Sequence, residues 1–333
     1  MNLDKFINME PMRYYDNPEP KTAGAVQKRL DMINNKDQLY IATEKHDGDW
    51  AMFVHGVKGE NHIRSRSLSK ITGQYGDYTL KLPHLVAEMD TWPDNTVVLA
   101  EVCWNEYGTN ANTVGTILRC LPVKAVERQQ EKKLFGLVFD ILMYDSEDLI
   151  ETPYKTRLTF AATLVRTGYF FQMTKIFYQD FGEAADTIIA AGGEGCVIQN
   201  KNNPYMPGTR TAWKTLKLKQ TLPHMDLKVI GVLEPTKEYH GDCAETWQYY
   251  KDGMAVTKPY YMGWKNGITI LLPSGLTTDV ASGLTDDDRA YLATEVARQA
   301  IAAGELWAEV KAMSINDKGA LRHPALVRLR TDM

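Results

Sequence analysis

The sequence predicts an α+β chain of two domains: one of strands and helices over residues 1–222, and a β-rich one over residues 223–333. Three observations support this prediction. A chain of 333 residues is long enough for two hydrophobic cores of ordinary size. Apolar strand-like runs and segments with helical spacing recur up to residue 219. Pro223 then interrupts the pattern, and mostly short strands are expected beyond it.

The first domain is expected to begin with a helix over residues 23–35, capped by Thr22. Apolar runs at residues 39–42 and 50–54 predict two strands around a tight, charged turn. Further strands are expected at 96–102, 134–142, 195–198 and 212–219, and further helices at 154–167 and 182–191. Because side chains alternate along a strand, Lys217 and Lys219 should point to one face.

The second domain is expected to contain strands at residues 226–233, 268–272 and 307–313, with one helix over residues 286–303. One helix packed on a few strands is compatible with an OB-fold barrel. Between the first two strands, residues 236–266 mix tyrosine and tryptophan with lysine, a combination suited to nucleic acid but also to simple packing. Residues 104–133 form a second segment that is a candidate for contacting DNA.

Composition restricts the class of protein. Hydrophobic residues make up 44% and charged residues 24%, as in globular proteins. No apolar run approaches the ~20 residues of a membrane span, and the N-terminus lacks the apolar core of a signal peptide, so a cytoplasmic monomer without membrane contact is expected. The four cysteines form no C-x-x-C pair for zinc. A net charge of −4 means that any nucleic-acid contact requires a local basic face.

The charged turn contains Thr43-Glu44-Lys45-His46-Asp47-Gly48, and Lys45 is a candidate covalent nucleophile. A lysine attacks only as the neutral amine, which requires burial or a nearby cation. By itself such a turn is far more often an ordinary β-turn with one solvated lysine. Its meaning therefore depends on the motifs that follow it.

Seven motifs follow one another in a recognisable order. They are Lys45-His46-Asp47-Gly48, Ser65-Arg66, Glu101 after an apolar strand, Phe135 to Leu142 as F-x-x-F-D-x-L, Glu194-Gly195, Leu216-Lys217-Leu218-Lys219, and Arg322-His323-Pro324 with Arg328 and Arg330. In this order they resemble the covalent nucleotidyltransferase superfamily, and most closely the small ATP-dependent DNA ligases of bacteriophages. The resemblance spans nearly the whole chain, from Lys45 to Arg330.

The resemblance implies an ATP-grasp-like nucleotidyltransferase domain of antiparallel sheets with helices, followed by an OB-fold β-barrel domain. It also implies ATP as cofactor with Mg²⁺ or Mn²⁺, and nicked double-stranded DNA as partner. Lys45 would accept AMP, which then passes to the 5′-phosphate at the nick before the 3′-hydroxyl attacks. Asp47, Lys217 and Lys219 would assist catalysis, and Glu194 with Glu101 or Asp140 would hold the metal. The cofactor would be bound by Thr43, Glu44, Lys45, Arg66, Glu101, Phe139, Lys214, Lys217, Lys219, Arg328 and Arg330. Phe135 competes with Phe139 for stacking on adenine, and a hinge is expected near residues 220–224.

Two positions depart from the pattern of the family. An arginine usually lies two positions after the K-x-D-G motif, but this chain has Trp50 there. One contact to ribose or phosphate is therefore missing or is supplied from elsewhere, for which Arg64 is a candidate. The terminal motif ends Arg330-Thr331-Asp332-Met333, without the usual lysine.

Two alternatives remain open at this stage. The first is an RNA ligase or an mRNA-capping guanylyltransferase of the same superfamily, although the Arg322-His323-Pro324 element favours a DNA ligase. The second is a non-catalytic nucleic-acid-binding relative, suggested by the two departures. An NAD-dependent ligase is disfavoured because that group resembles a longer chain with a four-cysteine zinc module.

Overall fold

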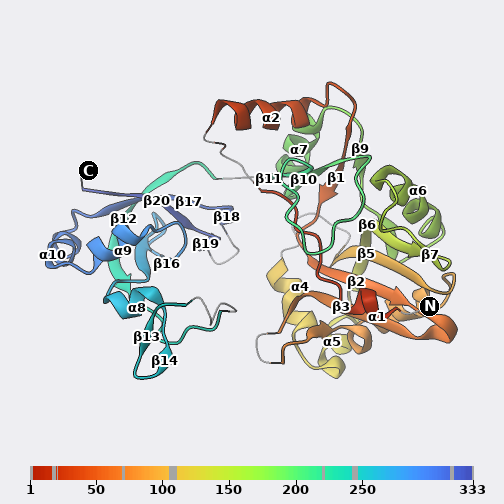
Figure 1. Cartoon of the computed structure of the whole chain (residues 1–333), viewed down its shortest axis with the longest axis horizontal. Coiled ribbons are helices and arrows are strands. Elements are labelled where there is room, and N and C mark those ends of the chain that lie inside the picture. Colours follow the sequence, from red (N-terminus) through yellow and green to blue (C-terminus); the bar gives the residue numbers. More distant parts are fainter. Residues whose placement is uncertain are drawn as a thin grey trace. The chain divides into compact units, whose positions relative to one another are not determined.

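A computed structural model describes residues 3–16, 20, 22–69, 72–104, 111–219, 222–241, 247–315 and 319–331. The chain divides into two compact units, Met1–Lys219 and Gln220–Met333 (Figure 1). In the part of the chain that is described, no helix is long and apolar enough to cross a membrane. The first residues of the expected hinge, 220 and 221, and the last two residues of the chain lie outside the described residues.

The larger sheet of the first unit has the strand order β4-β3-β2-β5-β6-β7, with β8 parallel beside β6. Its strands are β2 Asp49–His55, β3 Asn61–Leu68, β4 Tyr75–Asp77, β5 Thr96–Cys103, β6 Phe135–Tyr144, β7 Glu147–Asp148 and β8 Phe171–Met173. Both faces are buried, since Ala51 and Phe53 of β2 face one cluster while Trp50 and Met52 face another. Burial on both faces explains why β2, β5 and β6 are nearly continuous apolar runs.

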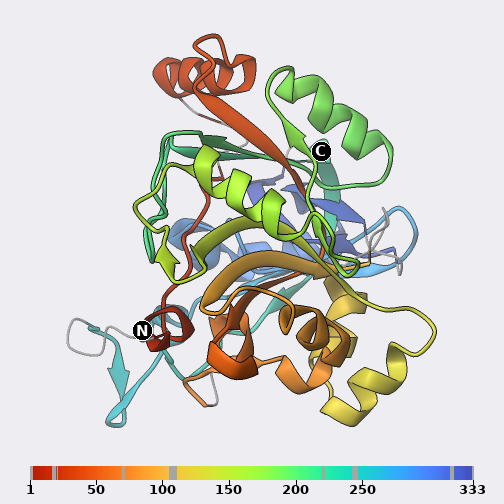
Figure 2. The ribbon, with the colours of Figure 1, turned by 90° about the vertical axis from the view of Figure 1, so that its right-hand side faces the viewer.

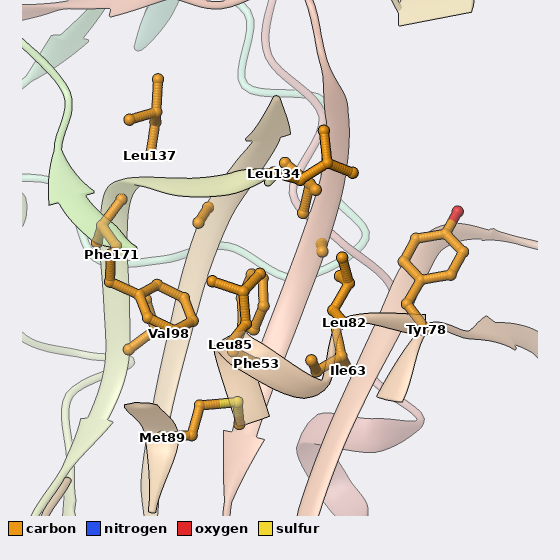
Figure 3. Close-up of a cluster of buried hydrophobic side chains, with 14 of the residues drawn as sticks. Phe53, Ile63, Tyr78, Leu82, Leu85, Met89, Val98, Leu134, Leu137 and Phe171 are labelled. Atoms are coloured by element: carbon orange, nitrogen blue, oxygen red, sulfur yellow. The ribbon is translucent and has the colours of Figure 1, made fainter. Parts of the chain in front are cut away.

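Short helices cover one face of this sheet: α3 Pro83–Met89, α4 Ala111–Leu118 and α5 Pro122–Arg128 (Figure 2). Leu85 and Met89 of α3 pack there with Phe53, Val98 and Phe171 (Figure 3). The other face is covered by α1 Asp4–Ile7 and the residues after it.

The smaller sheet has the order β11-β10-β1-β9 and contains β1 Tyr40–Lys45, β9 Ile176–Phe177, β10 Gly195–Asn200 and β11 Thr215–Lys219. Helices α2 Ala23–Asn34 and α7 Phe181–Ala190 pack on one of its faces (Figure 1). Thr22 caps α2 as expected, accepting a hydrogen bond from Ala25 N at 3.3 Å. The expected strand over 212–219 is shorter at its start, because residues 211–214 form a turn that Thr211 closes onto Thr215.

Asp140 is a structural residue, which makes its expected metal role wrong. Arg157 of α6 Tyr154–Leu164 donates two hydrogen bonds to its carboxylate, at 2.7 and 2.9 Å, and neither side chain is exposed. Arg157 also donates to the carbonyls of Thr152 and Asn203. A carboxylate held in this way ties α6 to β6, and it is completely buried and does not line the pocket of the first unit.

The second unit contains an antiparallel sheet of order β16-β15-β12-β17-β20, with β12 Met225–Leu233, β15 Gly267–Leu271, β16 Thr277–Val280, β17 Trp307–Lys311 and β20 Ala325–Arg330. A small pair, β18 Ser314–Ile315 and β19 Leu321–Arg322, adjoins it in sequence. The single helix expected over 286–303 is wrong. Two helices, α9 Asp286–Leu292 and α10 Glu295–Ala303, are each capped by a threonine, Thr285 and Thr294, because Thr294 accepts from Ala297 N and restarts the helix.

The aromatic segment between β12 and β15 packs largely on itself, around β13 Tyr250–Lys251, β14 Met254–Ala255 and α8 Lys258–Met262. Tyr239 and Trp247 stack with ring centroids 3.6 Å apart, and Trp247 Nε1 donates to the Val256 carbonyl at 2.7 Å. The Lys258 ammonium lies over the rings of Tyr249 and Trp264. These contacts favour the packing interpretation for most of the aromatic residues.

Asp140→Asn should lower the free energy of unfolding by about 3–5 kcal/mol, because it leaves the buried Arg157 charge without its partner. Replacing both residues, with Asp140→Leu and Arg157→Met, should cost less than the single change, since no uncompensated charge remains. Urea unfolding of the three proteins measures this. A single variant within about 1 kcal/mol of wild type would contradict the assignment.

Candidate active site

A pocket that is partly open to solvent is lined by residues from both sheets of the first unit. Its lining comprises Tyr14, Thr43, Glu44, Lys45, His46, Trp50, Arg66, Glu101, Phe139, Tyr154, Val197, Gln199 and Lys217. Seven of the expected cofactor residues are therefore together: Thr43, Glu44, Lys45, Arg66, Glu101, Phe139 and Lys217.

Strand register explains how the smaller sheet builds its side of the pocket. Val197 of β10 lies opposite Thr43 of β1 and Lys217 of β11, and Gly195 lies opposite Lys45 and Lys219. Directly opposed residues share a face, so these side chains point the same way. The intervening Cys196 and Ile198 are fully buried in the cluster under α7.

Two glycines permit the close approach of backbone at the Lys45 end. Gly195 has φ +124°, and a Cβ on it would lie 2.2 Å from the Leu218 carbonyl oxygen. A Cβ on Gly48 would lie 2.4 Å from the Val102 oxygen of β5. A side chain at Gly48 would push the Lys45 turn away from β5, and a side chain at Gly195 would push β10 away from β11.

Lys45 is held by carboxylates. Its Nζ is paired with the carboxylate of Glu194, the residue directly before β10. Burial alone would lower the pKa of Lys45, but Glu194 and Glu101 outweigh it and raise the pKa above its ordinary value. In the free protein Lys45 is therefore an ammonium ion.

Two neighbours of Lys45 titrate near neutral pH. Burial raises the pKa of Glu101 to about 7, with Lys45 opposing the shift and Glu194 adding to it. Burial and the charge of Lys45 lower the pKa of Lys217 to about 8. Burial and the same lysine lower the pKa of His46 to about 4, so His46 is neutral and can hydrogen-bond Thr174 Oγ1 through Nε2 at 2.9 Å. Strongly shifted groups gathered in one cleft are typical of functional sites.

The larger sheet contributes Glu101, Trp50 and Arg66 through its own register. Glu101 of β5 lies opposite Trp50 of β2, and the pairing of Ala51 with Ser65 brings Arg66 next to Trp50. Arg64 does not replace the missing arginine at position 50. Its guanidinium donates to the carbonyls of Phe6 and Met9 and stacks 4.0 Å from the Tyr75 ring centroid, and it does not line the pocket.

Of the two competing phenylalanines, only Phe139 lines the pocket. Phe135 packs against Tyr169 and Phe170 instead. The Tyr154 hydroxyl, which also lines the pocket, donates to the Phe139 carbonyl at 3.2 Å and fixes this part of β6.

The other expected site residues lie outside the pocket lining. Asp47 and Glu194 are close enough to raise the pKa of Lys45, and Lys219 is paired with Asp16 at 2.8 Å. Lys214 is exposed, with its Nζ 3.6 Å from the Met206 sulfur, because it precedes β11 in the turn. Arg328 and Arg330 belong to β20 of the second unit and pair with Glu309 and Asp226.

The sequence interpretation missed Tyr14, His46, Tyr154, Val197 and Gln199 as pocket residues. Alternation along β10 from Gly195 was a usable signal for Val197 and Gln199. No local pattern marks Tyr14, which reaches the pocket because residues 13–15 run beside β11: Lys217 N donates to the Tyr15 carbonyl at 2.9 Å. Burial raises the pKa of Tyr14 well above its ordinary value, so it is a neutral phenol.

The family model of the ATP-dependent DNA ligase domain matches residues 20–219, which is more than half of the chain. The chain belongs to this family. The match covers all the pocket residues except Tyr14. It confirms the expected resemblance, and the antiparallel sheets match those of ligase nucleotidyltransferase domains.

Individual relatives agree with this assignment. A DNA ligase of Methanococcus aeolicus is 24% identical over 295 residues, covering 83% of this chain and 50% of that protein. DNA ligase B of Mycobacterium tuberculosis is 30% identical over 191 residues, covering 54% of this chain and 34% of that protein. The chain thus spans half or less of the length of these two relatives. A solved structure from work on DNA binding with a minimal scaffold by Lig E DNA ligases has a TM-score of 0.60, at 17% identity, over 88% of this chain and 93% of that chain.

The raised pKa of Glu101 predicts a pH dependence of stability. The folded protein keeps the Glu101 proton up to about pH 7, whereas the unfolded carboxyl releases it near its ordinary value of 4.5. The unfolded state therefore binds fewer protons between these values, and the Glu101 contribution to the free energy of unfolding should fall by about 3 kcal/mol as the pH rises through this window.

Urea unfolding between pH 4.5 and 7.5 tests this prediction by comparing wild type with Glu101→Gln. The difference between the two proteins should grow with pH in favour of the variant. Glu151→Gln, which changes an exposed glutamate of the same unit, is the matched control. Parallel pH profiles for wild type and Glu101→Gln would contradict the prediction.

Proposed function

We propose that this chain is an ATP-dependent DNA ligase that seals nicks in duplex DNA through a lysyl-AMP intermediate. The observation that carries the proposal is Lys45, which is paired with Glu194 beside a pocket that also contains Glu101, Arg66 and Lys217. Membership of the ligase family supports the same reaction.

In the first step Lys45 Nζ forms a P–N bond to the α-phosphorus of ATP, and pyrophosphate leaves. In the second step a 5′-phosphate oxygen of the nick attacks the same phosphorus and releases Lys45. In the third step the 3′-hydroxyl attacks the activated 5′-phosphate, and AMP leaves. Such transfers depend on alignment and on neutralisation of charge, which Lys217 and Arg66 can supply in the pocket.

The amine must lose a proton before it can attack, because Lys45 is an ammonium ion in the free protein. Glu101 lines the same pocket, and its pKa of about 7 suits a group that accepts a proton near neutral pH. We assign it this role in the first step.

The same carboxylates fit a divalent metal. Burial, with a smaller contribution from the charge of Glu194, raises the pKa of Glu101, and a cation bound by the two carboxylates would oppose that shift. Mg²⁺ and Mn²⁺ prefer such oxygen ligands, and Mg²⁺ commonly uses one or two carboxylates together with substrate phosphates. When bound, the metal would neutralise phosphate charge. In the described residues no group of three or more His, Cys, Asp or Glu side chains could form a larger site.

The second unit belongs to the same proposal as an OB-fold domain after residue 222. Its antiparallel sheet of β12, β15, β16, β17 and β20 supports this assignment. Arg328 and Arg330 would contact the pyrophosphate of ATP during the first step and would then exchange Glu309 and Asp226 for phosphate. Tyr250 and Tyr261, both about half exposed, are the side chains of the aromatic segment best placed to contact DNA.

Lys45→Ala should abolish formation of a labelled protein adduct from α-labelled ATP and should abolish sealing of nicked duplex DNA. The reason is that no other side chain can supply the attacking nitrogen at that position. Lys155→Ala, which removes an exposed lysine of α6, is the matched control and should retain both activities. The proposal fails if wild type forms no adduct or if Lys45→Ala still forms it.

The substrate assay also separates the alternatives. Labelling by GTP in place of ATP would indicate a guanylyltransferase, and sealing of nicked RNA alone would indicate an RNA ligase. Binding of nicked DNA without any adduct would indicate a non-catalytic relative.

Trp50→Arg should destabilise the first unit by about 2 kcal/mol or more without accelerating adduct formation. Trp50 is only 7% exposed and packs with Met52 and Phe6, so the change removes core packing. It also adds a cation beside Arg66. Trp50→Phe, which keeps an aromatic ring, is the milder comparison, and urea unfolding with single-turnover adenylylation measures both effects. Faster adenylylation by a stable Trp50→Arg protein would show instead that tryptophan at position 50 slows adduct formation.

A further inference from the structure

Gln199 has no role in the proposed reaction, yet it is a pocket residue with an unsatisfied donor. Its side chain is 1% exposed and lines the pocket. Its Nε2 is buried without a hydrogen-bond partner among the residues that the structure describes. A buried donor left unpaired costs free energy, and one that lines a pocket can gain its partner from a bound ligand.

The position of Gln199 along β10 identifies which part of a nucleotide it can reach. Lys45 lies opposite Gly195, so the phosphorus that it attacks must lie at that end of the strand. Gln199 is four residues further on, on the same face, and the rise along a strand gives a separation of about 13 Å. A group beyond the ribose, and not a phosphate, is therefore its natural partner.

The surroundings of Gln199 suit a flat aromatic base. Val197, two residues before it, and the ring of Phe139 line the same pocket and offer apolar surface for the faces of a base. Thr215 of β11, which lies opposite Gln199, is fully buried and bonded to Thr211, so no charge competes for the amide. An amide nitrogen is a good donor to the ring nitrogens of a purine.

We infer that Gln199 contacts the adenine of ATP and donates a hydrogen bond from Nε2 to a ring nitrogen of the base. The inference rests on the proposed function, because it takes the pocket of Lys45 to be the ATP site. It assigns recognition of the base to a residue of β10 outside the seven motifs.

Gln199→Met and three ATP analogues test the contact. Methionine keeps the length of the side chain but has no N–H donor, and 1-deaza-, 3-deaza- and 7-deaza-ATP each replace one ring nitrogen by carbon. Single-turnover adenylylation of Lys45 gives KM and kcat for every pair. Wild type should lose about 5- to 50-fold in kcat/KM with one of the analogues. Gln199→Met should lose a similar factor in kcat/KM with ATP, mainly through a higher KM. When ATP is replaced by that same analogue, the variant should show no additional loss.

Controls separate a lost contact from a damaged fold. Gln172→Met makes the same chemical change on β8, outside the pocket lining, and should leave KM for ATP unchanged. If Gln199→Met does not fold, Gln199→Glu replaces the donor by an acceptor at nearly constant shape and should show the same pattern with a larger loss.

Three results would overturn the inference. The first is that wild type uses all three analogues with the same kcat/KM as ATP. The second is that the loss in kcat/KM caused by Gln199→Met multiplies with the loss caused by every analogue, so that the two changes act independently. The third is wild type that forms no adduct with ATP, which overturns the proposed function as well, whereas the first two leave the proposed function standing.

Discussion

The pairing of β1 with β10 is the constraint on which the site depends. It brings Lys45 opposite Gly195 and so next to Glu194, although the two charged residues are 149 positions apart in the chain. On its other side β10 pairs with β11, and this pairing requires a glycine at position 195, because at φ +124° a Cβ would lie 2.2 Å from the Leu218 carbonyl oxygen. From these two registers the direction of Thr43, Lys217 and Gln199 follows, since opposed residues of an antiparallel sheet share a face.

The protein uses buried charge in two different ways. Asp140 and Arg157 are both completely buried and fully hydrogen-bonded, a closed arrangement that fixes α6 on β6. Lys45, Glu101 and Glu194 form an open arrangement, in which Lys45 faces two carboxylates and the pKa of Glu101 is raised to about 7. In the closed pair each charge is already neutralised by its partner and hydrogen-bonded within the protein. The open group lies at a pocket, and groups with strongly shifted pKa values in a cleft are typical of functional sites, whereas the closed pair is typical of a structural contact.

Strands whose two faces are buried could be predicted from sequence, because β2, β5 and β6 are apolar at almost every position. The order of motifs identified most of the charged side of the pocket, including Lys45, Glu101 and Lys217. The contribution of Tyr14 could not be predicted, because it depends on backbone hydrogen bonds to β11, some 200 residues away. The break at Thr294 was missed for a local reason: apolar spacing continues through it, and only the threonine cap decides that two helices form.

Trp50 shows how packing and charge together determine what a position can hold. It lies between Glu101 and Arg66 on one face of the sheet, with the Arg64 guanidinium 5.6 Å from its ring centroid. The pocket already contains the cations of Lys45, Arg66 and Lys217, and the pKa of Lys217 is lowered partly by Lys45. Another cation here would add to that repulsion, whereas an indole fills the space and offers its face to Arg64. The aromatic residue at this position thus fits the existing balance of charge, which makes Trp50 compatible with a working site.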